Sequence, residues 1–73
     1  MTAINVASLN KFDDDETIGV EELLASGIIK KCEYGVKVLG NGALNKKLTV
    51  KAAAFSQSAM EKIVAAGGKA EVV

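Results

Sequence analysis

Apolar and polar residues alternate in short blocks through the first half of the chain, and each block predicts a small element. Ile4–Val6 has two β-branched apolar residues around one polar residue, the period of a half-buried strand. Leu9 and Phe12 follow at a spacing of three, which fits one helical turn. Val20–Ser26 predicts a helix, because its apolar positions share one face and Gly27 can end it in the left-handed conformation.

The second half predicts two strands, a helix and a closing strand. Val36–Leu39 is an apolar run that ends at the Gly-Asn-Gly triplet of residues 40–42, a strong signal for a hairpin turn. Leu48–Lys51 alternates, so one face is expected in the core and the lysine-bearing face in water. Ser56 is expected to cap a helix that ends at Gly67, and Ala70–Val73 closes the fold. The buried positions expected on this helix are Ala59, Met60, Ile63 and Ala66.

The order strand, helix, strand, strand, helix, strand predicts an α/β fold in which a small sheet is layered with helices. The chain has 73 residues, which permits one small domain. A globule of this size buries only about 60% of the surface that its unfolded chain exposes. Its stability is therefore expected near the low end of the usual range of about 5–15 kcal/mol.

The composition excludes most catalytic chemistry. The chain has no His, so it lacks an imidazole base, a Cys–His pair and a His metal ligand. Its single cysteine, Cys32, cannot form an internal disulfide, which fits a reducing cytoplasm. The apolar runs are far shorter than the ~20 residues that cross a bilayer. We therefore expect no enzymatic activity, cofactor, metal, small-molecule substrate or membrane partner.

The charges are balanced in number but uneven along the chain. Residues 1–29 hold one Lys against six acids, a net charge of −5, and residues 30–73 hold eight Lys against three acids, a net charge of +5. An electropositive face of this kind commonly binds phosphate or an acidic partner. Lysines on small domains also serve solubility, so the asymmetry leaves both interpretations open.

Three other features could carry binding chemistry, and each also has a purely structural interpretation. Asp13–Glu16 lacks the spaced ligands and central glycine of an EF-hand loop, which favours a solvated acidic loop over a cation site. The triplet at 40–42 lacks the further residues of a phosphate-binding loop, which favours a turn. Tyr34 is the single residue that could stack on a base, and base-stacking platforms use several aromatic residues. We therefore expect Tyr34 to pack over the turn at Gly35.

A set of motifs with fixed spacing covers nearly the whole chain. The matching segments are Lys37–Leu44, Leu48–Val50 and Phe55–Ser56 with Ala59, Ile63 and Gly67, extended by Asn5–Val6, Glu22–Leu24, Gly27–Lys31 and Gly67–Val73. This pattern resembles the C-terminal domain of the bacterial family of large ribosomal subunit protein fifteen, whose superfamily includes the archaeal and eukaryotic eighteen-e protein. The resemblance implies a small, irregular superhelix of β-β-α turns.

The resemblance also implies what accompanies this domain. Family members carry a long Gly-, Lys- and Arg-rich extension ahead of it that threads into ribosomal RNA, and the present sequence has no such stretch. We therefore expect residues 1–73 to be a single C-terminal ribosomal-protein domain without the N-terminal basic extension, either a truncated form or a protein unlike its relatives. The isolated domain should bind RNA weakly. Ala52–Ala54 and Gln57 replace residues that are often basic or polar in the family.

Two functions remain open. The first is a structural constituent of the large ribosomal subunit, in the cytoplasmic ribosome, that binds large-subunit ribosomal RNA through backbone phosphates beside neighbouring ribosomal proteins. The second is a module that docks neighbouring ribosomal proteins through its acidic first third or an apolar patch near Ile28 and Ile29, with little RNA affinity. Ser56 either seats an anion at a helix start or only caps that helix. The candidate RNA-binding residues are Lys30, Lys31, Lys46, Lys47, Lys51, Ser56, Ser58 and Lys69.

Overall fold

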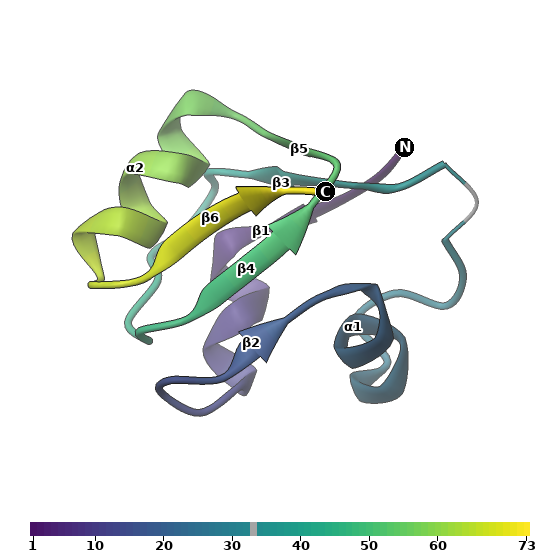
Figure 1. Ribbon diagram of the computed structural model, residues 1–73, viewed down its shortest axis with the longest axis horizontal. Coiled ribbons are helices and arrows are strands. Elements are labelled where there is room, and N and C mark those ends of the chain that lie inside the picture. Colours follow the sequence, from purple (N-terminus) through teal and green to yellow (C-terminus); the bar gives the residue numbers. More distant parts are fainter. Residues whose placement is uncertain (33) are drawn as a thin grey trace.

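In the described part of the chain, six short strands form two separate sheets, and their pairings are all parallel (Figure 1). The computed structural model describes residues 1–32 and 34–73. One sheet has the order β1 (Thr2–Asn5), β3 (Val36–Leu39), β5 (Ala54–Phe55), and the other has the order β2 (Thr17–Ile18), β4 (Thr49–Ala52), β6 (Lys69–Val72). The helices are the 3-10 helix η1 (Val6–Lys11), α1 (Val20–Ser26) and α2 (Gln57–Ala65).

The chain winds as a superhelix of three coils. Each coil adds an odd-numbered strand to the first sheet and the next even-numbered strand to the second, so strands consecutive in sequence do not pair. The coils are not equivalent, because α1 follows the two strands of the first coil whereas α2 lies between the two strands of the third. The predicted α/β class and irregular superhelix are confirmed, but the single small sheet that the element order predicted is wrong, because the strands divide between two sheets.

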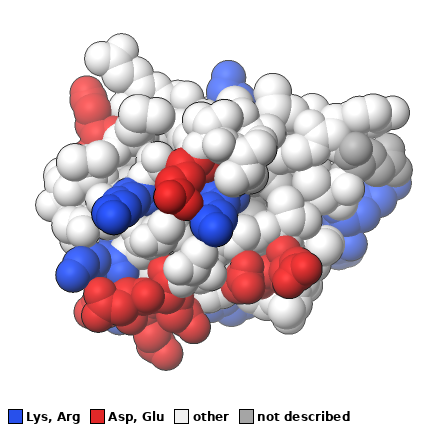
Figure 2. Space-filling model, in the orientation of Figure 1, with Lys and Arg blue, Asp and Glu red and all other residues white. Residues whose placement is uncertain are grey.

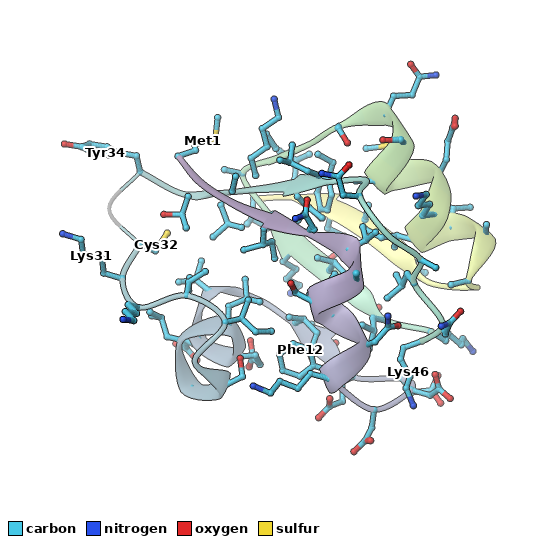
Figure 3. The ribbon with its side chains drawn as sticks, turned by 180° about the vertical axis from the view of Figure 1, so that it is seen from behind. Met1, Phe12, Lys31, Cys32, Tyr34 and Lys46 are labelled. Carbon is cyan, nitrogen blue, oxygen red and sulfur yellow. The ribbon has the colours of Figure 1, made fainter. Side chains whose placement is uncertain are left out.

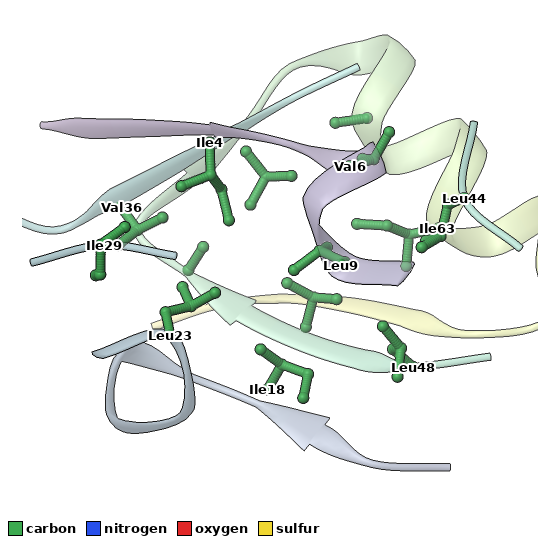
Figure 4. Close-up of a cluster of buried hydrophobic side chains, with 14 residues drawn as sticks. Ile4, Val6, Leu9, Ile18, Leu23, Ile29, Val36, Leu44, Leu48 and Ile63 are labelled. Carbon is green, nitrogen blue, oxygen red and sulfur yellow. The ribbon is translucent and has the colours of Figure 1, made fainter. Parts of the chain in front are cut away.

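The core lies between the two sheets (Figure 4). Ile4, Val36 and Val38 of the first sheet face inward, as do Ile18 and Val50 of the second, and all are at most 6% exposed. None of the described polar or charged side chains is buried with them. The fold is therefore held by aliphatic burial. The other core residues are Val6, Leu9, Leu23, Ile29, Leu44, Leu48, Ala52, Ala59 and Ile63.

Several predicted boundaries are confirmed and others shift by one or two residues. The helix predicted over Val20–Ser26 has that span, and Gly27 ends it with a φ of 82°. The first strand lies at Thr2–Asn5, because Val6 already begins η1. The closing strand is Lys69–Val72. The two-residue strands β2 and β5 were not predicted.

The hairpin expected at residues 40–42 is wrong, because β3 and β4 belong to different sheets. The two glycines serve close packing instead. A Cβ on Gly40 would collide with the Ser58 side chain at the start of α2, and a Cβ on Gly42, whose φ is 83°, would lie 2.5 Å from the Ala7 Cβ in η1. The triplet is therefore a loop pressed between two helices.

Three expectations about exposure are also wrong. Met60 is 41% exposed, because Ala59 and Ile63 form the buried face of α2 and the next position is turned about 100° away. Tyr34 is 79% exposed and does not pack away over Gly35. Ile29 is buried and Ile28 is half-buried against the core, so these two residues form no exposed apolar patch.

Candidate nucleic-acid interface

The outer face of the second sheet carries two rows of polar side chains. Paired residues of parallel strands project to the same face. The pairing of Thr49 with Lys69 therefore places both on one row, and the pairing of Lys51 with Glu71 makes the next row. Val50 lies between these rows and points into the core. Lys51 and Lys69 thus share the solvent-facing side of this sheet, as the alternation in Leu48–Lys51 predicted for Lys51.

Lys47 stands at the edge of this face and is held by the acidic loop before β2. Its backbone N–H donates to Asp14 Oδ1 at 2.8 Å, and its carbonyl accepts from the Asp15 N–H at 2.6 Å. Its Nζ lies 3.4 Å from Asp15 Oδ1. A Cβ on Gly67 would lie 3.6 Å from Lys47 Cγ, so the lysine stem runs over the turn that leads into β6. Lys47 and the start of β6 are therefore neighbours.

Two of the candidate lysines already contact a carboxylate. Besides the Lys47–Asp15 pair, Lys51 Nζ lies 3.9 Å from Glu71 Oε2. All four side chains are 45% to 75% exposed, and exposed pairs of this kind contribute only about 0–1 kcal/mol. A phosphate oxygen can therefore replace either carboxylate at small cost. Within the described residues, Lys30, Lys46 and Lys69 form no ion pair.

The eight candidate residues do not form one continuous surface. Lys46, Lys47, Lys51 and Lys69 border the second sheet, whereas Lys30 and Lys31 follow α1. Figure 3 shows Lys31 and Lys46 at opposite ends of the molecule. Figure 2 shows acidic and basic side chains interleaved on the face that carries β4 and β6. The structure therefore places the candidate lysines in at least two separate places.

Ser56 caps α2. Its φ of −71° and ψ of 159° are typical of an N-cap, and its Oγ accepts a hydrogen bond from the Ala59 N–H at 3.2 Å. Ser58 Oγ lies 3.3 Å from Ser56 Oγ. Gly40 packs against Ser58, so the loop at residues 40–42 sits beside the first turn of the helix. The capping interpretation accounts for the Ser56 hydroxyl.

The loop that precedes Lys46 is held by two side chains that the sequence analysis did not single out. Lys62 Nζ donates to the carbonyl oxygens of Gly40 and Gly42, both at 2.6 Å. Asn10 Nδ2 donates to the Ala43 carbonyl at 2.8 Å, and Asn10 Oδ1 accepts from the Asn45 N–H at 2.7 Å. No local pattern could have indicated these contacts, because their partners lie 20 to 35 residues away.

The described residues also bear on the possibility of a membrane-spanning helix or a metal site. None of the helices in residues 1–32 and 34–73 is long and apolar enough to cross a membrane. Over the same residues, no three His, Cys, Asp or Glu side chains come together as possible metal ligands.

Comparison with known proteins identifies the class of protein to which this fold belongs. Residues 3–71 match the model of the family that groups ribosomal proteins 50S-L15 and 50S-L18e with their counterpart in the 60S subunit, and the chain belongs to this family. A curated relative, the large ribosomal subunit protein uL15 of Agathobacter rectalis, is 59% identical over 70 residues. These residues are 96% of the present chain and 48% of the relative, so the chain spans about half the length of the curated relative it matches. The family predicted from the motifs is confirmed.

Proposed function

We propose that this chain is a structural constituent of the large ribosomal subunit, which binds ribosomal RNA and supports assembly of the subunit in the cytoplasm. The observation that carries the proposal is the 59% identity to protein uL15 over 96% of the chain. Residues 1–73 correspond, in this proposal, to the C-terminal domain of such a protein. Its role is to hold RNA and neighbouring ribosomal proteins in place, and it catalyses no reaction.

The lysines bordering the second sheet are the proposed phosphate contacts. Lys46, Lys47, Lys51 and Lys69 present ammonium groups on flexible stems, which bind phosphates as point charges and do not read bases. Since RNA can surround a protein on several sides, a second contact at Lys30 and Lys31 is compatible with their distant position. Ser58, next to the capping hydroxyl of Ser56, completes the proposed set as a phosphate hydrogen-bond donor.

A salt titration tests this proposal. The chain is mixed with fragments of large-subunit ribosomal RNA at several salt concentrations, and the dissociation constant is measured for the wild type and for the variant Lys46→Ala/Lys47→Ala/Lys51→Ala. Lys37→Ala is the control for these three lysines, because Lys37 lies on the outer face of the first sheet and not on the sheet that carries Lys51.

We expect affinity to fall with salt. The slope of log affinity against log salt should decrease by about 0.7–0.9 for each phosphate contact removed. Lys37→Ala should change the slope far less. An RNA affinity that does not change with salt concentration, or that is the same in the triple variant as in the wild type, would contradict the proposal.

A second candidate function is the docking of a neighbouring ribosomal protein, and the exposed side of α2 favours it. Met60 is 41% and Val64 58% exposed, and together with Gln57, Glu61 and Ala65 they line an open groove. The variant Met60→Ser/Val64→Ser separates the two functions. If docking dominates, this variant should reduce incorporation into reconstituted large subunits while its affinity for isolated RNA stays unchanged.

A further inference from the structure

One aromatic ring stands free in solvent at the end of the molecule opposite Lys46 (Figure 3). Tyr34 is 79% exposed, whereas Phe12 and Phe55, the other aromatic residues of the chain, are half-buried against the core. An aromatic ring with this exposure contributes little to the packing of the fold. Its faces are available to a planar ligand.

Hydrogen bonds and close packing fix the backbone that follows Tyr34. Gly35 has a φ of 87°, and a Cβ at this position would lie 2.7 Å from the Ala53 Cβ. The Gly35 carbonyl accepts from the Thr2 N–H at 2.9 Å, and the carbonyl of the next residue, Val36, accepts from the Ala53 N–H at 2.9 Å. Tyr34 thus projects from the start of β3 at a point where three coils of the chain meet. Because the residues that follow the ring are fixed, binding needs little ordering of the backbone on that side of Tyr34.

The ring borders a hollow of basic and polar character. Met1, Thr2, Lys31 and Tyr34 line it, and the exposed Lys30 lies in the same segment of the chain. Positive charge beside an exposed aromatic face is the combination by which proteins bind single-stranded nucleic acid: the cations contact the backbone and the ring stacks on a base. Among the described lining residues only Met1 supplies a fully apolar side chain, so the hollow itself offers little apolar surface to a partner protein.

We propose that Tyr34 stacks on an unpaired base of the bound RNA while Lys30 and Lys31 contact the phosphates beside that base. The proposal rests on the RNA-binding function above and deepens it. The lysines bordering the second sheet bind the phosphate backbone of paired and unpaired RNA alike. The contact at Tyr34 instead requires a nucleotide that is not in a duplex. One ring takes one base, so the site recognises a bulge or loop and not a long single strand.

Tyr34 itself is a fluorescent probe for this contact. The chain has one tyrosine and no tryptophan, so tyrosine fluorescence reports on residue 34 alone. The chain is titrated with two RNA probes that have equal numbers of phosphates: a hairpin with an unpaired loop from large-subunit ribosomal RNA, and a fully paired duplex. Binding is followed in parallel by the anisotropy of a dye on the RNA.

We expect the hairpin to quench the tyrosine fluorescence with the same midpoint as the anisotropy change, and the duplex to bind without quenching. Tyr34→Ala should weaken binding of the hairpin by at least about fivefold and leave duplex binding unchanged. Tyr34→Phe keeps the ring and should retain the affinity. The thermal midpoint of Tyr34→Ala should equal that of the wild type, because the side chain is exposed.

The outcomes separate the two proposals. Salt-dependent binding of the hairpin without quenching, and with unchanged affinity in Tyr34→Ala, would overturn the stacking contact and leave RNA binding standing. An equal loss for hairpin and duplex in Tyr34→Ala would likewise overturn stacking. If neither RNA binds the wild-type chain, the proposed function itself fails, and the inference that depends on it fails too.

Discussion

Asp15 and Lys47 contact each other through both backbone and side chain. The Asp15 N–H donates to the Lys47 carbonyl at 2.6 Å, and Asp15 Oδ1 lies 3.4 Å from Lys47 Nζ. Asp15 also has a φ of 70°, a left-handed conformation that Asp and Asn adopt more readily than most residues. The carboxylate therefore occupies the place beside the ammonium group that a phosphate oxygen would take in a complex with RNA.

Removing this competing carboxylate should strengthen RNA binding. Asn tolerates the left-handed backbone, so Asp15→Asn removes the charge and keeps the loop. An exposed ion pair is worth at most about 1 kcal/mol, so the gain in affinity should not exceed about fivefold. The measurement is the dissociation constant for a ribosomal RNA fragment at fixed salt.

Asp13→Asn is the control for Asp15→Asn, because it removes the same charge from the same loop and Asp13 has no ion pair with Lys47 within the described structure. An equal gain in affinity in both variants would mean that the acidic loop weakens RNA binding only through long-range electrostatic repulsion, and not through the contact between Asp15 and Lys47. No gain in either would mean that Lys47 does not contact phosphate.

Gly40→Ala should destabilise the fold. The added Cβ would collide with the Ser58 side chain and lie 2.8 Å from the Ala59 backbone N, in the first turn of α2. Overpacking of this kind typically costs about 1–3 kcal/mol. Urea unfolding followed by circular dichroism measures the change, and Asn41→Ala, at the exposed tip of the same loop, should stay within about 0.5 kcal/mol of wild type. Wild-type stability in Gly40→Ala would show that the loop can move away from α2 freely.

Lys62→Met should loosen the same loop from the other side. The substitution keeps the apolar stem and removes the ammonium group that donates to Gly40 and Gly42. Because hydrogen bonds from charged groups contribute about 1.5–3 kcal/mol and this group is only partly buried, we expect a loss of about 1–2 kcal/mol. Lys69→Met, on an exposed residue without an ion pair in the described structure, should be close to neutral in the same urea titration. Equal stability of the two variants would contradict a structural role for Lys62.

Ser56→Ala tests whether the start of α2 is a cap or an anion site. Loss of the hydrogen bond from the Ala59 N–H to Ser56 Oγ should cost about 1 kcal/mol of stability, as N-cap substitutions do. Under conditions where the variant is fully folded, its affinity for RNA should equal that of the wild type. Ser58→Ala is the control for the stability measurement alone, because Ser58 does not cap the helix but is itself a proposed phosphate contact. A folded Ser56→Ala variant that binds RNA several-fold more weakly would favour the anion site.

Local chemistry explains which elements could be predicted. α1 has the predicted span because its apolar face, the two acids of its first turn and the left-handed Gly27 all lie within one short segment. The strands β2 and β5 have two residues each and gain strand geometry only from partners far along the chain, Thr49 for Thr17 and Lys37 for Ala54. The sequence of a two-residue segment contains no signal for a strand partner so far along the chain.

The motif that identifies the family describes the fold more than the RNA contact. Ala59 and Ile63 are fully buried, Ser56 caps α2, and Gly40 and Gly42 fit between helices. The sequence therefore predicted the family and the α/β class, but not the division of the strands between two sheets. It could not predict that Lys47 and Lys51 face carboxylates, or that Lys31 and Lys46 lie at opposite ends, because these relations arise from pairings between distant strands and loops.

The alternation of strands between two sheets also determines how this chain can fold. Ile4 pairs with Val38 and Ile18 with Val50, separations of more than thirty residues, and no hairpin offers a nearby first contact in the described parts of the chain. Loop-closure entropy must therefore be overcome before any sheet hydrogen bond forms, and refolding is expected on the order of milliseconds to seconds, slow for so short a chain. The third coil supplies β5 to one sheet and β6 to the other. A nascent chain therefore cannot complete either sheet until this coil has left the ribosomal exit tunnel.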